Sequence, residues 1–197
     1  MIQRNPMTRR KSTYPIHDCI LNRWSPRAIS EEMISDEQMM SLFEAARWAP
    51  SSFNAQLWRF VYAKRGTPYF QKFFDLLVPF NQSWAKNASF LVLIISRTKF
   101  TYNDQPSRTH SFDAGAAWQN LALEGSTQGL VAHAMEGFNY DKARQVCAIP
   151  DDYSIEAMVA VGKHGLIADL PEELREREFP SDREPLQTFL FEGIFRK

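Results

Sequence analysis

The stretch that decides the fold of this chain is Ala49-Pro50-Ser51-Ser52-Phe53-Asn54-Ala55-Gln56-Leu57-Trp58-Arg59-Phe60, where a helical pattern gives way to an apolar strand pattern. Pro50, Ser51 and Asn54 are typical of a tight turn. Turn formation alone explains these three residues, but it does not explain why Gln56 and Trp58 follow. The stretch therefore predicts a rigid turn that carries four short polar side chains, Ser51, Ser52, Asn54 and Gln56.

Helical and strand patterns mix on both sides of this turn. Before it, Ser35-Asp36-Glu37-Gln38 is a capping-box pattern, and Met39, Leu42, Phe43 and Ala46 follow at helical spacing. Apolar runs predict strands at 58–63, 88–96, 130–135 and 155–161, and the periodicity predicts further helices at 15–22, 69–77, 111–128 and 140–147. Gly129 stands where a left-handed helix cap is expected. Because strands and helices do not alternate strictly, we expect an α+β fold rather than a doubly wound parallel sheet.

Composition bounds the class of protein. The chain has 197 residues, of which 44% are hydrophobic, and its formal net charge is zero, so nothing pulls it generally towards nucleic acid or a membrane surface. No apolar run reaches the roughly 18 residues of a membrane span, and no apolar signal core stands at the N-terminus. Cys19 and Cys147 lack metal-ligand spacing, which favours a reducing, cytoplasmic setting. We expect a flexible tail over 1–14, with Arg9-Arg10-Lys11 solvated, and one domain over 15–197.

A basic row follows the first predicted helix. The segment Arg23-Trp24-Ser25-Pro26-Arg27 contains a proline and reads as extended, so that alternate residues face the same way. Two cations and a hydroxyl then lie on one side, an arrangement that suits a phosphate at one end and an electron-rich ring edge at the other. The alternative is a solvated basic segment.

Three further segments hold candidate residues. Asn81 precedes the 88–96 strand and otherwise reads as a residue that ends a helix; Met135-Glu136-Gly137 follows the 130–135 strand and otherwise reads as a plain turn. Near the C-terminal end, Lys163 and Arg183 are candidate cations, although Lys163 also fits a surface residue. No Ser-His-Asp or metal-ligand pattern is evident.

Together these residues resemble the nitroreductase family of flavin mononucleotide (FMN) enzymes. The family carries an A-P-S-S-x-N-x-Q-P-W-x-F signature, which the turn matches with Leu57 in place of proline, and an R-x-S-x-[RK] element, which Arg23, Ser25 and Arg27 match. The likeness covers about residues 15 to 190. It implies a central mixed, largely antiparallel sheet flanked by helices, in an obligate homodimer with two FMN sites at the interface.

The resemblance also implies roles for individual residues. Arg23 and Arg183 meet the FMN phosphate, Ser25 the ribityl chain, and Arg27 the N1/O2 edge of the flavin. Asn81 contacts the ribityl or the O2 edge, and the Gly137 amide donates to flavin N5, so that Glu136 and Gly137 form the catalytic segment. Lys163 substitutes for a lysine that Ser181 replaces, and Trp84 stands where the family often has a cation. The remaining implied cofactor-binding residues are Trp24, Met135 and, contributed from the partner subunit, Pro50, Ser51, Ser52, Asn54 and Gln56.

The implied activity is hydride transfer from NADH or NADPH, through flavin N5, to a small oxidant such as a nitroaromatic, quinone or enone, in ping-pong order. Two alternatives stay open. One is a non-catalytic flavin-binding or storage protein, and the other is a flavin-dependent dehalogenase or dehydrogenase on the same fold.

Overall fold

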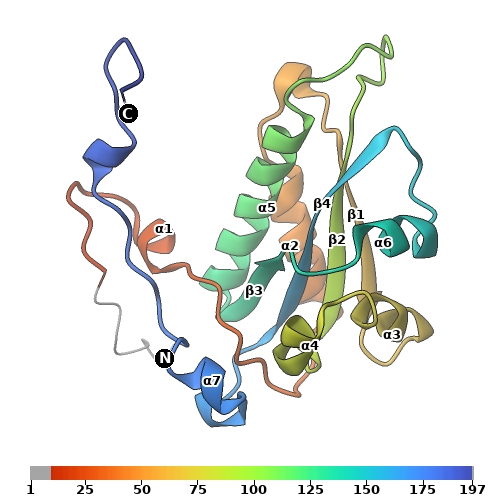
Figure 1. Ribbon diagram of the computed structural model, residues 1–197, viewed down its shortest axis with the longest axis vertical. Helices are drawn as coiled ribbons and strands as arrows, with labels where there is room; N and C mark the ends of the chain where they lie inside the picture. The colour runs from red at the N-terminus through yellow and green to blue at the C-terminus, as the bar shows by residue number, and fades with distance from the viewer. Residues whose placement is uncertain (1–9, 197) are drawn as a thin grey trace.

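The computed structural model describes residues 10–196, whose helices and strands form two helical layers around one sheet (Figure 1). The strands are β1 (Trp58–Lys64), β2 (Phe90–Arg97), β3 (Leu130–Met135) and β4 (Tyr153–Lys163). The α-helices are α1 (Asp18–Asn22), α2 (Asp36–Arg47), α3 (Pro68–Phe74), α4 (Pro79–Ala85), α5 (His110–Thr127), α6 (Tyr140–Val146) and α7 (Glu172–Arg175). Short 3-10 turns lie at Ser52–Asn54, Ile167–Asp169 and Leu186–Thr188.

The sheet has the strand order β1-β2-β4-β3, and all of its pairings are antiparallel. The prediction of a mixed sheet was therefore wrong for the described strands. One register shift interrupts β2 and β4 between Ile94 and Ile95, where Glu156 is the extra residue of β4. A β-bulge of this kind lets a side chain leave the regular alternation of the strand.

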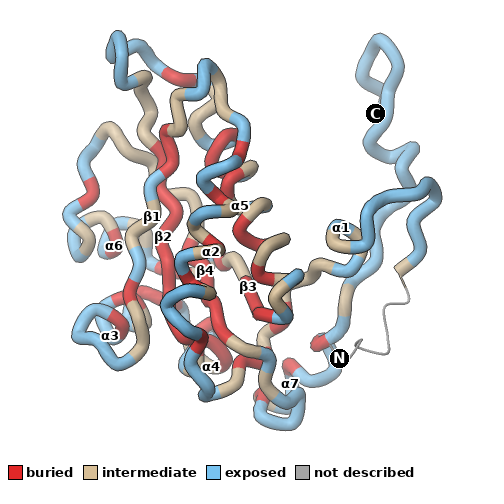
Figure 2. The backbone as a smooth tube through the Cα atoms, turned by 180° about the vertical axis from the view of Figure 1, so that it is seen from behind, coloured by how far each residue is buried: buried red, intermediate tan, exposed pale blue. Residues whose placement is uncertain are grey.

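Strand β2 is central because both of its faces are apolar. Phe90, Val92 and Ile94 point into the cluster beneath α2 and α5, while Leu91 and Leu93 point into the cluster on the opposite face. An uninterrupted apolar run is expected of a strand covered on both sides. Figure 2 shows the resulting band of buried backbone through the middle of the molecule.

The first helical layer consists of α2 and α5. The capping box at the start of α2 is confirmed, because the Ser35 hydroxyl accepts from the Gln38 amide and the Gln38 side chain accepts from the Ser35 amide. Gly129, at φ +70°, closes α5 as predicted. The small residues of α5 serve this layer: Ala114, Ala117, Ala122 and Gly125 are buried against α2 and the sheet within one chain.

The second layer holds α3, α4, α6 and α7, and the sequence patterns missed two of these helices. Helix α4 begins at Pro79, whose fixed φ suits a first helical position, so Asn81 lies inside a helix and does not end one. Helix α7 is four residues long and buries only Leu174. Short helices of this kind depend on tertiary packing more than on propensity.

The segment after Arg27 packs against the residues that follow β4. Ile29 forms a bridge with His164, and the Ser30 amide donates to the Lys163 carbonyl, so the segment after Arg27 extends the sheet beyond β4. A Cβ at Gly165 would lie 2.8 Å from the Ile29 carbonyl carbon, which explains the glycine there. Figures 1 and 2 show α1 beside the exposed C-terminal arm, residues 185–196.

Candidate functional site: an arginine pocket between the chain ends

A cavity of about 310 Å³ lies where the N-terminal segment, β3 and the segment after α7 meet. Its lining residues are Arg10, Arg23, Trp24, Ser25, Arg27, His133, Arg177, Phe179, Ser181 and Arg183. Five of these ten are arginines. No carboxylate is among the described residues that line it.

The segment after α1 forms one wall of the pocket. Arg23 is the extended C-cap of α1, and the segment stays extended through Pro26. The Pro26 carbonyl is 2.9 Å from His133 Nδ1, which holds the segment against β3. Arg23, Ser25 and Arg27 all reach the cavity, as predicted, but Trp24 between them lines it too, so the strict alternation of an extended chain does not hold here.

Arg10 connects this wall to the segment after α7, which forms the opposite wall. Its Nη1 donates to the carbonyls of Leu21 and Arg23, at 3.1 and 2.8 Å, and its Nε donates to the Ser181 carbonyl at 2.7 Å. The prediction that the basic run is solvated was therefore wrong for Arg10. Arg9 lies outside the described residues.

The guanidinium groups repel one another. Burial lowers the pKa of Arg23, and the positive charge of Arg183 lowers it further. Burial also lowers the pKa of Arg10, to which Arg183 and Arg23 add. Like charges crowded without a lining carboxylate favour an anionic ligand, because the anion removes the repulsion and gains charge-assisted hydrogen bonds.

A neutral histidine forms the floor of the pocket. Burial lowers the pKa of His133 to about 4, and the neighbouring cations Arg27 and Arg23 add to this shift. Its ring centroid lies 4.6 Å from that of Trp84 in α4, whose side chain is buried and whose Nε1 has no partner among the described residues. Trp84 thus backs the floor without lining the cavity.

The residues at the end of β3 form a second part of the candidate site, and they do not line the arginine pocket. Met135 is buried in the core and Glu136 is exposed. The Gly137 carbonyl accepts from Asn81 Nδ2 at 3.0 Å and from the Val78 amide at 3.1 Å. A Cβ at Gly137 would lie 2.7 Å from Asn81 Nδ2, so the close contact requires glycine. The Gly137 amide makes no hydrogen bond within residues 10–196.

The turn from Pro50 to Gln56 does not line the pocket of its own chain, and three hydrogen bonds fix its backbone. The Ser51 hydroxyl accepts from the Gln56 amide at 3.0 Å, and Gln56 Nε2 donates to the Asn54 carbonyl. The Ser52 amide donates to Asp113 of α5. Phe53, Asn54 and Gln56 all have positive φ, which holds the exposed Phe53 ring outward.

Lys163 is placed elsewhere. Its ammonium pairs with Glu32 at 2.8 Å, and it does not line the cavity. The role of Lys163 as a substitute cation of the site stays a prediction, and Glu32 balances its charge within one chain. Arg183 does reach the pocket, as do Arg177, Phe179 and Ser181 beside it.

Ser96, His110 and Glu156 form a separate polar cluster at the β-bulge. Ser96 Oγ lies 2.7 Å from His110 Nδ1 and also donates to Glu156, which accepts a second hydrogen bond from Ser111. A hydrolytic triad places the histidine between serine and carboxylate, with a different ring nitrogen towards each. Here the same nitrogen faces both, and Ser96 is fully buried, so the cluster anchors the start of α5 to the sheet.

Two broad classes of site are not found in the described part of the chain. No group of three histidine, cysteine or carboxylate side chains is placed to hold a metal ion there. None of the helices over 10–196 has the length and apolar character needed to cross a membrane. The two cysteines are free.

Comparison with known proteins agrees with this geometry. The profile of the nitroreductase family matches residues 20–75 and 67–163. A solved structure described as an oxidoreductase containing FMN superposes with a TM-score of 0.90 at 44% identity, covering 95% of this chain and 96% of its own. A nitroreductase-like protein of Desulfovibrio desulfuricans, solved in complex with FMN, superposes with a TM-score of 0.70 at 26% identity, over 90% and 96% of the two chains.

A curated relative points the same way. Protein DrgA of Synechocystis is 28% identical over 177 residues, which is 74% of this chain and 82% of DrgA. The family profile covers well over half of the chain and includes both Arg23-to-Arg27 and the Pro50-to-Gln56 turn. The chain belongs to the nitroreductase family.

Proposed function

We propose that the protein is an FMN-dependent oxidoreductase that uses NADH or NADPH and works as a homodimer. The observation that carries this proposal is the arginine pocket, a cavity between the N-terminal segment and the segment after α7 that has room for an anion. When bound, FMN would supply the chemistry, accepting hydride from the nicotinamide and passing it to a small oxidant such as a nitroaromatic, quinone or enone in ping-pong order.

The residues present fit a flavin phosphate. Guanidinium groups offer forks of fixed donors that match phosphate oxygens, and the pocket contains five of them. The Arg27 Nε is buried without a partner within the described residues, so a donor is already in place for a ligand atom. We assign Arg23 and Arg183 to the phosphate, Ser25 to the ribityl chain, and Arg27 to the N1/O2 edge of the ring.

The chain also supports the reactive end of the flavin. Gly137 has an amide without a partner among residues 10–196, and Asn81 fixes its carbonyl. We assign this amide to flavin N5, with Glu136 and Met135 beside it. His133, neutral and in tilted contact with the Trp84 ring, would present an uncharged surface between these residues and the arginines. No nucleophilic side chain is required, because the side chains bind, orient and tune charge.

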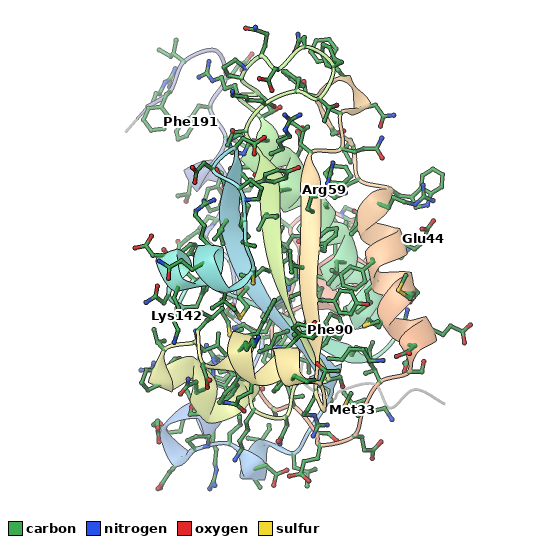
Figure 3. The ribbon with its side chains drawn as sticks, turned by 90° about the vertical axis from the view of Figure 1, so that its right-hand side faces the viewer. Met33, Glu44, Arg59, Phe90, Lys142 and Phe191 are labelled. Atoms are coloured by element: carbon green, nitrogen blue, oxygen red, sulfur yellow. The ribbon has the colours of Figure 1, made fainter. Side chains whose placement is uncertain are left out.

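Two observations support a homodimer with shared sites. The Pro50-to-Gln56 turn stands apart from the pocket of its own chain, as expected if it serves the pocket of a partner. The C-terminal arm also exposes an unusual number of large apolar residues, namely Leu186, Phe189, Leu190, Phe191, Ile194 and Phe195. Figure 3 shows Phe191 on this arm, whereas Phe90 lies within the body beside β1. Apolar side chains on an extended arm gain stability when a second subunit covers them.

The test begins with the visible absorption spectrum of the purified protein and the mass of any released flavin. FMN is expected, whereas a colourless protein that binds no added FMN, or one that carries FAD, contradicts the proposal. Steady oxidation of NADH or NADPH with a quinone or nitroaromatic then separates an enzyme from a flavin-storage protein. A cytoplasmic setting, suggested by the two free cysteines, is part of the same proposal.

A further inference from the structure

Glu178 is a buried carboxylate directly behind the arginine pocket. It follows the short helix α7, and only 1% of its side-chain surface is exposed. Its Oε1 accepts from the backbone amides of Arg27 and Ala28, at 2.6 and 2.8 Å. Two consecutive amides converging on one oxygen fix the direction in which the chain leaves Arg27. Glu178 lies beyond the segments that match the family profile, which end at residue 163.

The second oxygen of this carboxylate makes no hydrogen bond. Glu178 Oε2 lies 4.0 Å from Arg27 Nη1, and both Oε2 and Arg27 Nε are buried without a partner among the described residues. The two charges therefore attract each other without joining in a close ion pair. Arg27 keeps its donors available to the cavity, while the negative charge stays within reach of anything that binds there.

A structural role alone does not need this arrangement. A neutral amide oxygen could accept both backbone hydrogen bonds, and burying a carboxylate is costly unless its charge is used. Among the residues that line the cavity there is no carboxylate. Glu178 is the buried carboxylate that faces Arg27, whereas the carboxylate that acts on Arg10, Asp182, is exposed to solvent.

We propose that Glu178 is a positioning residue that aims Arg27 into the pocket through its backbone and supplies a buried negative charge that weakens the attraction of the pocket for anions. The affinity of the pocket is then a balance between the arginine cluster and this internal counter-charge. The partial neutralisation allows a bound anion to be released. It also sets how strongly Arg27 stabilises negative charge on a bound ring.

The experiment uses inorganic phosphate as the probe, titrated calorimetrically at constant ionic strength. Glu178→Gln keeps the amide oxygen that the two backbone N–H groups need and removes the charge. It should bind phosphate roughly tenfold more tightly than wild type, because one buried negative charge is gone. Glu176→Gln is the matched control, since it makes the same change in net charge on an exposed residue two positions away and should leave the affinity unchanged.

Further variants separate charge from positioning. Arg27→Gln should weaken phosphate binding about tenfold, and Arg27→Gln/Glu178→Gln should return close to wild type, because both charges are removed together. This double variant decides the matter even if Glu178→Gln alone does not fold. The proposal is overturned if the double variant binds phosphate as weakly as Arg27→Gln does. It is also overturned if Glu178→Gln folds and binds phosphate no more tightly than wild type.

A last measurement rests on the proposed flavin. In the FMN-bound protein, Glu178→Gln should shift the midpoint potential of the flavin in the positive direction and Arg27→Gln in the negative direction, whereas a purely structural Glu178 would shift neither consistently. If the phosphate results hold but no variant binds FMN, the proposed function fails and the role of Glu178 stands. If FMN binds and the potentials do not move in opposite directions, the role of Glu178 fails alone.

Discussion

The Pro50-to-Gln56 turn and the arginine pocket are both polar, but hydrogen bonds hold the turn together whereas like charges crowd the pocket. In the turn, Ser51 accepts from Gln56, and Gln56 donates to Asn54. In the pocket, burial and then the charge of Arg183 lower the pKa of both Arg10 and Arg23, and no carboxylate lines the described cavity. Polar groups that hydrogen-bond to one another within the fold need no ligand, whereas a cluster of like charges is stabilised by a ligand of opposite charge. The contrast predicts that changes in the pocket alter ligand binding and that the same kind of change in the turn alters mainly local stability.

The largest effect is expected from acid, on the pocket side. His133 has a pKa of about 4 when folded, against about 6.5 when exposed, because burial disfavours its charged form. As the pH falls from about 6.5 to 4, His133 therefore becomes protonated in the unfolded chain while it stays neutral in the folded chain. This should cost up to about 3 kcal/mol of folding free energy, a loss that is absent above pH 6.5.

His133→Gln should remove that part of the pH dependence, and urea unfolding of wild type and variant between pH 4 and pH 7 measures it. His17→Gln, at an exposed histidine, should keep the wild-type slope. Saturating phosphate should protect the wild type from acid, because an anion in the pocket offsets the added charge. An unchanged slope in His133→Gln would mean that the buried ring is not what limits acid stability.

Next in size is the loss of one phosphate ligand. Arg23→Ala should weaken FMN binding about tenfold or more, since a charge-assisted hydrogen bond contributes about 1.5–3 kcal/mol. Riboflavin, which lacks the phosphate, should bind both proteins equally. Fluorescence titration of the apoprotein gives both affinities, with Arg47→Ala on the exposed face of α2 as control. Equal losses for FMN and riboflavin would point to misfolding rather than to a phosphate contact.

A mixing experiment tests whether the turn belongs to the pocket of a partner. Asn54→Gly/Gln56→Gly removes two side chains while tolerating the positive φ at both positions. If sites are shared, this variant and Arg23→Ala should each lose FMN. Mixing them by unfolding and refolding together should restore roughly a quarter of the sites, because half of the dimers are mixed and each holds one intact pair. No recovery, with mixed dimers present by mass spectrometry, would place the turn outside the shared site.

The smallest effect is expected within the turn. Ser51→Ala leaves the Gln56 amide without its acceptor and should lower the free energy of unfolding by about 1 kcal/mol. Phosphate affinity should not change, because Ser51 does not line the pocket of its own chain. Thermal unfolding and the phosphate titration check the two parts separately. A large fall in phosphate affinity would show that the turn shapes the pocket within one subunit.

The local elements could be predicted from the sequence because their signals are local. The capping box at Ser35 and Gln38 and the glycine cap at Gly129 depend on residues a few positions apart. Helix α4 was missed because Val78 and Pro79 start it without a side-chain cap. The antiparallel pairing of the four strands depends on how the helices between them return the chain, α3 and α4 after β1, α5 after β2 and α6 after β3. No residue pattern states this.

The pocket was only half predictable for a similar reason. The alternation of Arg23, Ser25 and Arg27 is a local pattern, and their common side follows from it. Arg177 and Glu178 stand in a run of alternating charges that is typical of a solvated surface helix. Glu178 is buried because Leu170 and Leu174 pack into the core and turn the end of this run inward, whereas Arg177 stays exposed at the pocket. The pairing of Lys163 with Glu32, 131 residues away, could not be predicted from a local pattern either.

The bond between Arg10 and Ser181 joins residues 171 positions apart. On the ribosome, the sheet and both helical layers can form before the segment that carries Arg177 to Arg183 has been synthesised. The pocket must therefore be the last part of the subunit to assemble, since contacts of such separation close late. A nascent chain halted before residue 177 would be compact yet unable to hold an anion. Ligand binding would thus report that synthesis has passed this point. Limited proteolysis of the exposed C-terminal arm, residues 185–196, should leave phosphate binding intact, because every residue that lines the pocket precedes the arm.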